Sequence, residues 1–233
     1  MLQRALIVAV LSLGAAAPAF AAPIYFSSER WVNAHVQVRD ANGQFVDQDF
    51  DNGSSNNPGQ YIDEANAALV DPAGSGLASA SQTSDIGADS FSGSLTTSGT
   101  SNTGTTYFEG VNLYFVTFDL LTTHTFELTG AATTASGYQR FYFCRAGEDP
   151  CIFDINSSSP NGAFSVADTL EAGRYQLYSY MYALGYNTAA ATSINFNLAL
   201  TEQGATAPEP TSMLLLGTGL VGVGVRRWRH KRA

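Results

Sequence analysis

Residues 111–120 read Val-Asn-Leu-Tyr-Phe-Val-Thr-Phe-Asp-Leu, and this stretch decides the fold class. Its apolar side chains occupy both odd and even positions: Val111, Leu113, Phe115 on one side, and Tyr114, Val116, Phe118 on the other. An extended chain places alternate side chains on opposite faces. A run that is apolar on both faces therefore predicts a strand covered on both sides.

Shorter alternating stretches lie on either side of this run. Val32, Ala34, Val36 and Val38 alternate with polar residues, and similar patterns recur at residues 91–95, 126–128, 141–143, 151–155, 175–181 and 194–200. Turn-forming pairs such as Asn42-Gly43 separate them. The pattern predicts an all-β fold of eight or nine strands, a β-sandwich of jelly-roll-like type. Residues 62–69 favour one short helix, and the Ser-, Thr- and Gly-rich residues 73–106 predict a long loop or weak strands.

The composition limits the classes of function. The 233 residues are 45% hydrophobic and 13% charged, with 14 Phe and 11 Tyr, so the chain can bury a core. A net charge of -9 argues against nucleic acid as a partner, because phosphate binding needs clustered Lys and Arg. Residues 22–207 contain 19 acidic residues, five arginines and no lysine.

The first 21 residues have the pattern of a secretory signal. Arg4 precedes the apolar residues 5–13, and Ala19-Phe20-Ala21 matches an A-x-A cleavage site. We therefore expect a signal helix that engages the Sec translocon, with cleavage between Ala21 and Ala22.

The last 26 residues combine three features in a fixed order. Pro208, Glu209, Pro210 and Thr211 precede the apolar residues 213–225, and five basic residues crowd the final eight positions. The apolar stretch is shorter than the about 20 residues of a spanning helix, and four glycines interrupt it. The basic end stays in the cytoplasm and leaves the body outside. The expected organisation is a signal peptide (1–21), an acidic β-sandwich body (22–207) and a sorting tail (208–233).

This tail resembles the PEP-CTERM sorting signal of Gram-negative bacteria that make exopolysaccharide. The matching residues are 208–212, 213–217 and 226–229, and Ala207 stands where the family usually has Val. The resemblance implies a sorting helix that is inserted transiently in the inner membrane and processed by an exosortase, a membrane thiol protease. The prolines favour an extended segment, the form that proteases bind. An ordinary single-span anchor is the alternative.

Cys144 and Cys151 flank six residues that read as a turn. In an exported protein this placement predicts a structural disulfide across a hairpin tip. Two free thiols or a metal pair are the alternatives.

Asp47, Asp49 and Asp51 form an acidic cluster that we expect to lie in a turn. Carboxylates at this spacing are candidate ligands for Ca²⁺, which takes six to eight oxygens. The EF-hand spacing is not matched, and a solvated acidic loop is the alternative.

Tyr178, Tyr180 and Tyr182 lie on one face of a predicted strand. If exposed, they form an aromatic strip for carbohydrate contact; if buried, they belong to the core or to a dimer contact. The opposite face carries Leu177, Ser179 and Met181 and is mixed, so the sequence leaves both interpretations open.

Signatures of catalysis are sparse. His35 and His124 are the histidines of the body, no G-x-S-x-G motif occurs, and no pair of carboxylates stands out for glycoside hydrolysis. We therefore expect a non-enzymatic protein that is exported to the cell surface or extracellular matrix, associates with exopolysaccharide and has a structural or adhesive role. A carbohydrate-binding module that uses the three tyrosines is the first alternative, and a glycoside hydrolase the second.

Overall fold

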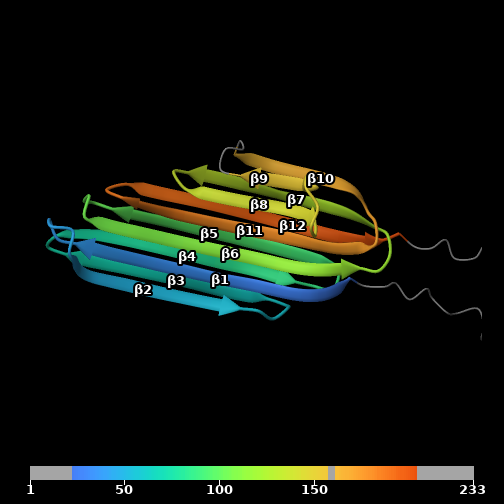
Figure 1. The fold of residues 1–233 in the computed structure, drawn as a ribbon, viewed down its shortest axis with the longest axis horizontal. Coiled ribbons are helices and arrows are strands. Elements are labelled where there is room, and N and C mark those ends of the chain that lie inside the picture. Colours follow the sequence, from blue (N-terminus) through green and yellow to red (C-terminus); the bar gives the residue numbers. More distant parts are fainter. Residues whose placement is uncertain (1–22, 157–160, 204–233) are drawn as a thin grey trace, which may run out of the picture. The chain divides into compact units, whose positions relative to one another are not determined.

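A computed structural model of the chain describes residues 23–156 and 161–203. In this part the regular elements are strands, arranged as two antiparallel sheets of six strands each (Figure 1). The predicted β-sandwich is confirmed, with twelve strands rather than eight or nine. The predicted signal helix and sorting helix lie outside the described residues. Within those ranges, no helix has the length and apolarity that crossing a bilayer requires.

At both edges of the sandwich, an edge strand of one sheet is connected directly to an edge strand of the other. Sheet A has the order β2 (Phe45–Ser55), β1 (Ile24–Arg39), β6 (Thr106–Leu120), β11 (Gly173–Tyr186), β8 (Tyr138–Arg145), β9 (Phe153–Asn156). Sheet B has the order β10 (Gly162–Leu170), β7 (His124–Ala135), β12 (Ala189–Glu202), β5 (Ser90–Ser101), β4 (Gly74–Ile86), β3 (Tyr61–Asp71). The chain passes from sheet A to sheet B four times among the described strands, and two of these passages, β2 to β3 and β9 to β10, join edge strands. Each edge of sheet A is therefore followed directly by an edge of sheet B.

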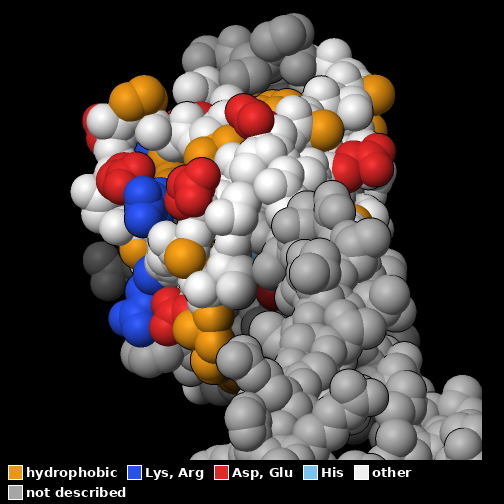
Figure 2. All heavy atoms as spheres, turned by 90° about the vertical axis from the view of Figure 1, so that its right-hand side faces the viewer, with side chains coloured by type: hydrophobic (Ala, Val, Ile, Leu, Met, Phe, Trp, Pro, Cys, Tyr) orange, Lys and Arg blue, Asp and Glu red, His pale blue; other side chains and the backbone are white. Residues whose placement is uncertain are grey.

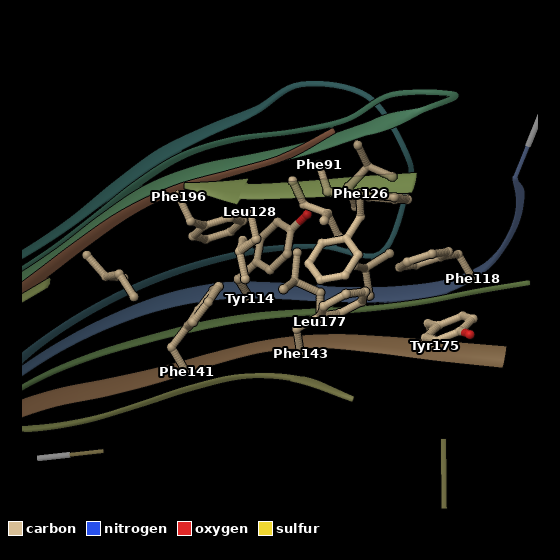
Figure 3. Close-up of a cluster of buried hydrophobic side chains, with 14 of the residues drawn as sticks. Phe91, Tyr114, Phe118, Phe126, Leu128, Phe141, Phe143, Tyr175, Leu177 and Phe196 are labelled. Atoms are coloured by element: carbon tan, nitrogen blue, oxygen red, sulfur yellow. The ribbon is translucent and has the colours of Figure 1, made fainter. Parts of the chain in front are cut away.

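The interior is divided into an aromatic part and a part made of small side chains. In the aromatic part, Phe91 stacks on Phe118 with ring centroids 4.5 Å apart, and Phe141 contacts Phe196 at 5.0 Å (Figure 3). The other part consists of alanines and valines around Phe108. Gly99 faces Phe108 so closely that a Cβ there would lie 2.0 Å from the ring. Glycine on β5 thus leaves room for the one large ring of this part.

A fully buried arginine closes one end of the interior. Arg30 on β1 donates to the carbonyl oxygens of Asn57 and Gly59 in the β2–β3 connection, the latter at 2.8 Å. Its guanidinium also lies 5.2 Å from the ring centroid of Tyr61. Burial lowers the pKa of Arg30 from its ordinary value. The side chain therefore fixes the connection that crosses between the sheets.

One local prediction is wrong, and one choice that the sequence left open is settled. The helix expected over residues 62–69 is part of strand β3, where Tyr61, Ala65 and Ala67 are buried and the residues between them are more exposed. This period of two follows from pairing with β4 along the whole strand, which overrides the helix propensity of Ala, Glu and Leu. For the Ser-, Thr- and Gly-rich residues 73–106, the alternative of strands is confirmed and the long loop is not: they form β4 and β5, joined as a hairpin.

Candidate functional site

The three tyrosines singled out in the sequence lie on the outer face of sheet A. Tyr178, Tyr180 and Tyr182 are half-buried, while Leu177 and Met181 on the opposite face of β11 are fully buried between the sheets. The three tyrosines are therefore not part of the sandwich core. The described strands form two layers, so no third layer covers this face in the described part of the chain.

Strands β6 and β8 flank β11 and add three further tyrosines to this surface, and the end of β11 adds a fourth. We call the surface the tyrosine face, and it comprises Tyr107, Tyr138, Tyr142, Tyr178, Tyr180, Tyr182 and Tyr186. Sequence analysis missed Tyr107, Tyr138 and Tyr142. The sequence does contain a signal for two of them. Tyr138 and Tyr142 lie on one face of a strand whose other face carries Phe141 and Phe143, and this pattern predicts that the tyrosines point away from the core.

Neighbouring strands place the rings of this face against one another. Tyr142 and Tyr178 are a directly opposed pair with parallel rings, whose centroids are 4.7 Å apart at an interplanar angle of 17°. Tyr138 and Tyr182 form a second such pair, at 5.0 Å and 14°. Both separations match the spacing between adjacent strands. Such stacked cross-strand pairs stabilise the sheet as well as forming its surface.

Apolar side chains fill the middle of the face. Val111 and Leu113 on β6 point outward and yet are buried by the surrounding rings. Leu113 is directly opposite Tyr180 on one side and Trp31 on the other. On the β8 side, the Arg140 guanidinium lies 5.3 Å from the Tyr142 ring centroid and 3.6 Å from the Asp154 carboxylate.

Burial raises the pKa of Tyr142, Tyr178 and Tyr180 above the usual range. The pKa of Tyr107 is also raised, by burial first and then by the charge of Glu109 and a side-chain hydrogen bond to it. These hydroxyl groups therefore stay protonated at neutral pH, where each is able to donate a hydrogen bond.

Polar side chains lie at one end of the tyrosine face. Glu109 on β6 is directly opposite His35 on β1. The His35 ring also lies 6.2 Å from Tyr107 and 6.2 Å from Phe50, both edge to face. The other histidine of the body, His124, is buried, with Nδ1 2.9 Å from the carbonyl oxygen of Thr122.

The predicted disulfide is present between Cys144 and Cys151. It joins the end of β8 to the residues just before β9, beside the cis peptide bond of Asp149-Pro150. Its role is structural, because it ties the short edge strand β9 to its neighbour.

The acidic cluster is not a turn but part of strand β2. Asp47, Asp49 and Asp51 stand at alternate positions, opposite the inward-facing Val38, Val36 and Ala34 of β1. Asp49 and Asp51 accept hydrogen bonds from the backbone N–H groups of Ala68 and Asn66 on β3. In residues 23–156 and 161–203, no three acidic, His or Cys side chains group together as a metal site would require. The calcium site thus remains a prediction from the sequence alone.

The outer face of sheet B carries small polar side chains where the tyrosine face carries aromatic rings. It carries Ser, Thr and Ala side chains, including the hydrogen-bonded pairs Ser81–Thr96 and Thr133–Ser193. A shallow groove of about 660 Å³ runs over it, lined by small side chains such as Ala68, Ser98 and Ala191. Its large apolar side chains are exposed singly, as with Ile62, Val70 and Leu77.

The C-terminal tail decides where the protein is sent. A family model for the PEP-CTERM protein-sorting motif matches residues 206–229. The chain carries a PEP-CTERM sorting motif. This motif makes the chain an exported, exosortase-targeted protein and implies processing by an exosortase. No curated protein matches the chain. The motif residues Pro208, Glu209, Pro210 and Thr211, and the predicted cleavage site at Ala21 and Ala22, lie outside the described residues.

Proposed function

We propose that this PEP-CTERM protein is a non-enzymatic surface or matrix protein that holds exopolysaccharide through the tyrosine face of sheet A. The sorting motif indicates that the protein is exported. The association with exopolysaccharide rests on the concentration of seven of the eleven tyrosines on one sheet face that no other described strand covers. Tyrosine offers an apolar ring together with a hydrogen-bonding hydroxyl, which suits the alternating CH and OH groups of a sugar.

The distribution of aromatic residues supports a ligand that carries hydrogen-bonding groups. Phenylalanine dominates the interior, with Phe91, Phe118 and Phe143 among its fully buried side chains. On the outer face of sheet A, tyrosine is the commonest aromatic residue, with seven tyrosines beside Trp31 and Phe115. Tyrosine hydroxyl groups need polar partners when they are covered, and the hydroxyl groups of a sugar supply them.

A non-enzymatic role is supported by the positions of the groups that most often act as acid, base or nucleophile. Both cysteines are joined in a disulfide, and His124 is buried against a backbone carbonyl. His35 is held between two aromatic rings. These side chains serve packing and covalent cross-linking, which fits a binding protein.

The experiment compares retention of the protein by cells that secrete exopolysaccharide. We expect the triple variant Tyr178→Ala/Tyr180→Ala/Tyr182→Ala to be exported normally but to be released into the medium instead of being recovered with the polysaccharide. The matched control removes three exposed apolar side chains from sheet B, as Ile62→Ala/Val70→Ala/Leu77→Ala. Equal retention of wild type and tyrosine variant would overturn the proposal, provided that both melt at similar temperatures.

A further inference from the structure

The stacked tyrosine pairs present ring edges and hydroxyl groups, rather than ring faces, to a ligand. Two rings that lie flat and side by side on a sheet cannot bring their centroids to the 4.7 Å of Tyr142 and Tyr178 or the 5.0 Å of Tyr138 and Tyr182. The rings of each pair therefore stand upright, face to face. Since strand side chains project away from the sheet, the para-hydroxyl groups are at the outer tips. One face of each ring is thus covered by its partner.

Arg140 limits the stacking surface further. Its guanidinium lies over the Tyr142 ring, 5.3 Å from the centroid, and Tyr178 stacks on the same ring at 4.7 Å. Tyr180 contacts Tyr182 edge to face at 5.9 Å. The groups that this part of the face presents to a ligand are mainly protonated hydroxyl groups, which donate and accept hydrogen bonds.

The arginines of the body are already engaged by protein partners, including Arg140 beside Tyr142 of the tyrosine face. Arg174 forms a bidentate pair with Asp119 at 2.8 and 3.0 Å, Arg145 pairs with Glu148, and Arg140 pairs with Asp154. Arg30 is fully buried and Arg39 donates to the Gly43 carbonyl oxygen. In the view of Figure 2, the basic side chains lie beside acidic ones. Because residues 22–207 contain no lysine, the body has few cations with which to bind an anionic ligand.

The face itself carries negative charge at its polar end. Glu109 lies two residues from Tyr107 on the outer side of β6, where its charge contributes to the raised pKa of Tyr107, and it is directly opposite His35. A carboxylate accepts hydrogen bonds from sugar hydroxyls but repels uronate, sulfate or phosphate groups. The surrounding body, with 19 acidic residues against five arginines, adds long-range repulsion at low ionic strength.

From these contacts we propose that the tyrosine face binds uncharged polysaccharide, and that tyrosine hydroxyl groups recognise the sugar hydroxyls by hydrogen bonding instead of stacking the sugars on ring faces. This inference rests on the proposed function and names its class of ligand. It assigns Tyr178, Tyr180 and Tyr182 the role of hydrogen-bonding groups, with Glu109 as a determinant against acidic glycans.

The test is affinity electrophoresis of the mature protein through gels containing a neutral β-glucan or alginate, a polyuronate, at low and high salt. The decisive variant is Tyr178→Phe/Tyr180→Phe/Tyr182→Phe, which keeps the rings and their packing and removes only the hydroxyl groups. We expect retardation by the neutral glucan, an at least about tenfold weaker affinity for the Phe variant, and no retardation by alginate at low salt.

Each other outcome has a distinct meaning. Unchanged affinity of the Phe variant would overturn hydrogen-bond recognition, because ring stacking would then suffice. Retardation by alginate as strong as that by the glucan would overturn the choice of uncharged ligands but leave the proposed function intact. If neither this glucan nor alginate nor the polysaccharide of the producing cells retards the wild-type protein, the proposed function itself fails.

Discussion

The carboxylate of Asp49, on β2 of sheet A, accepts the backbone N–H of Ala68, on β3 of sheet B, at 2.8 Å. Asp51 accepts the N–H of Asn66 in the same way at 3.0 Å. Strand β3 is the edge of its sheet, so these N–H groups are not paired with another strand. The acidic cluster therefore closes an open sheet edge and joins the two layers.

Removal of these carboxylates is expected to weaken the fold. Asp49→Ala and Asp51→Ala should each lower the free energy of unfolding by about 1 kcal/mol, because each leaves a backbone N–H without its charged acceptor. Asp47→Ala is the matched control, since Asp47 accepts the N–H of the adjacent Gln48. Urea denaturation measures the three variants, and an equal loss for Asp47→Ala would refute the bridging role.

The same segment allows a test of calcium. With the Asp49 and Asp51 carboxylates occupied by β3, we expect the melting temperature of the protein to be the same with EGTA and with added Ca²⁺. A fall of several degrees with EGTA would instead support the calcium site that the sequence suggests.

Arg30 is expected to be the most costly single charge to remove. Arg30→Met would leave the carbonyl oxygens of Asn57 and Gly59 without their donor and should lower the free energy of unfolding by about 3 kcal/mol. Arg30→Lys should recover only part of this loss, because an ammonium group cannot reach both carbonyls as a guanidinium does. Arg39→Met, on an exposed side chain, is the control and should cost little; guanidinium chloride unfolding compares all three.

The Arg174–Asp119 pair predicts a dependence of stability on acid. The hydrogen bond from Arg174 lowers the pKa of Asp119 below its ordinary value. Folding then favours the ionised carboxylate, so the contribution is complete above the unfolded-state pKa of about 3.9 and is lost as the pH falls through the lower folded-state pKa. Both side chains are partly exposed, so the contribution is small.

Thermal melts between about pH 2.5 and 6 measure this contribution. The difference in melting temperature between wild type and Asp119→Asn should shrink as the pH falls. A difference that stays constant with pH would show that the pair is not linked to folding in this way.

The mature form should lack both ends of the chain. Intact-mass analysis of protein recovered from the medium is expected to give a chain that begins at Ala22, has lost the basic end with Trp228, and carries the Cys144–Cys151 disulfide. Deletion of the host exosortase should leave a membrane-bound form that retains Trp228. Mature wild-type protein that still contains Trp228 would contradict processing.

The sequence predicts the fold class and the inward faces well, because alternation in segments such as residues 32–38 reflects burial directly. It fails for residues 62–69, where Ala, Glu and Leu favour a helix locally and only the partner strand β4 selects an extended chain. For Asp47, Asp49 and Asp51, the alternation with Gln48 and Phe50 was itself the signal of a strand.

The candidate site could be predicted only in part. Tyr178, Tyr180 and Tyr182 are evident from their spacing, but both faces of their strand carry large side chains, so one strand alone cannot tell which face points inward. That choice is made by β8 and β6, whose Phe143 and Phe118 pack inside and whose Tyr142 and Tyr107 remain outside. The stacking of rings from separate strands depends on register and is not visible in the sequence.

Hydroxyl-radical footprinting of the mature protein, with and without polysaccharide from the producing cells, tests the central claim most directly. Hydroxyl radicals oxidise tyrosine, tryptophan, leucine and isoleucine side chains, each faster when it is more exposed, so both faces of the sandwich are measured in one sample. We predict that bound polysaccharide lowers the oxidation of Tyr178, Tyr180, Tyr182 and Trp31, while Ile62 and Leu77 on sheet B remain as reactive as before. Protection confined to sheet B, or no protection of the tyrosine face under saturating polysaccharide, would contradict the account.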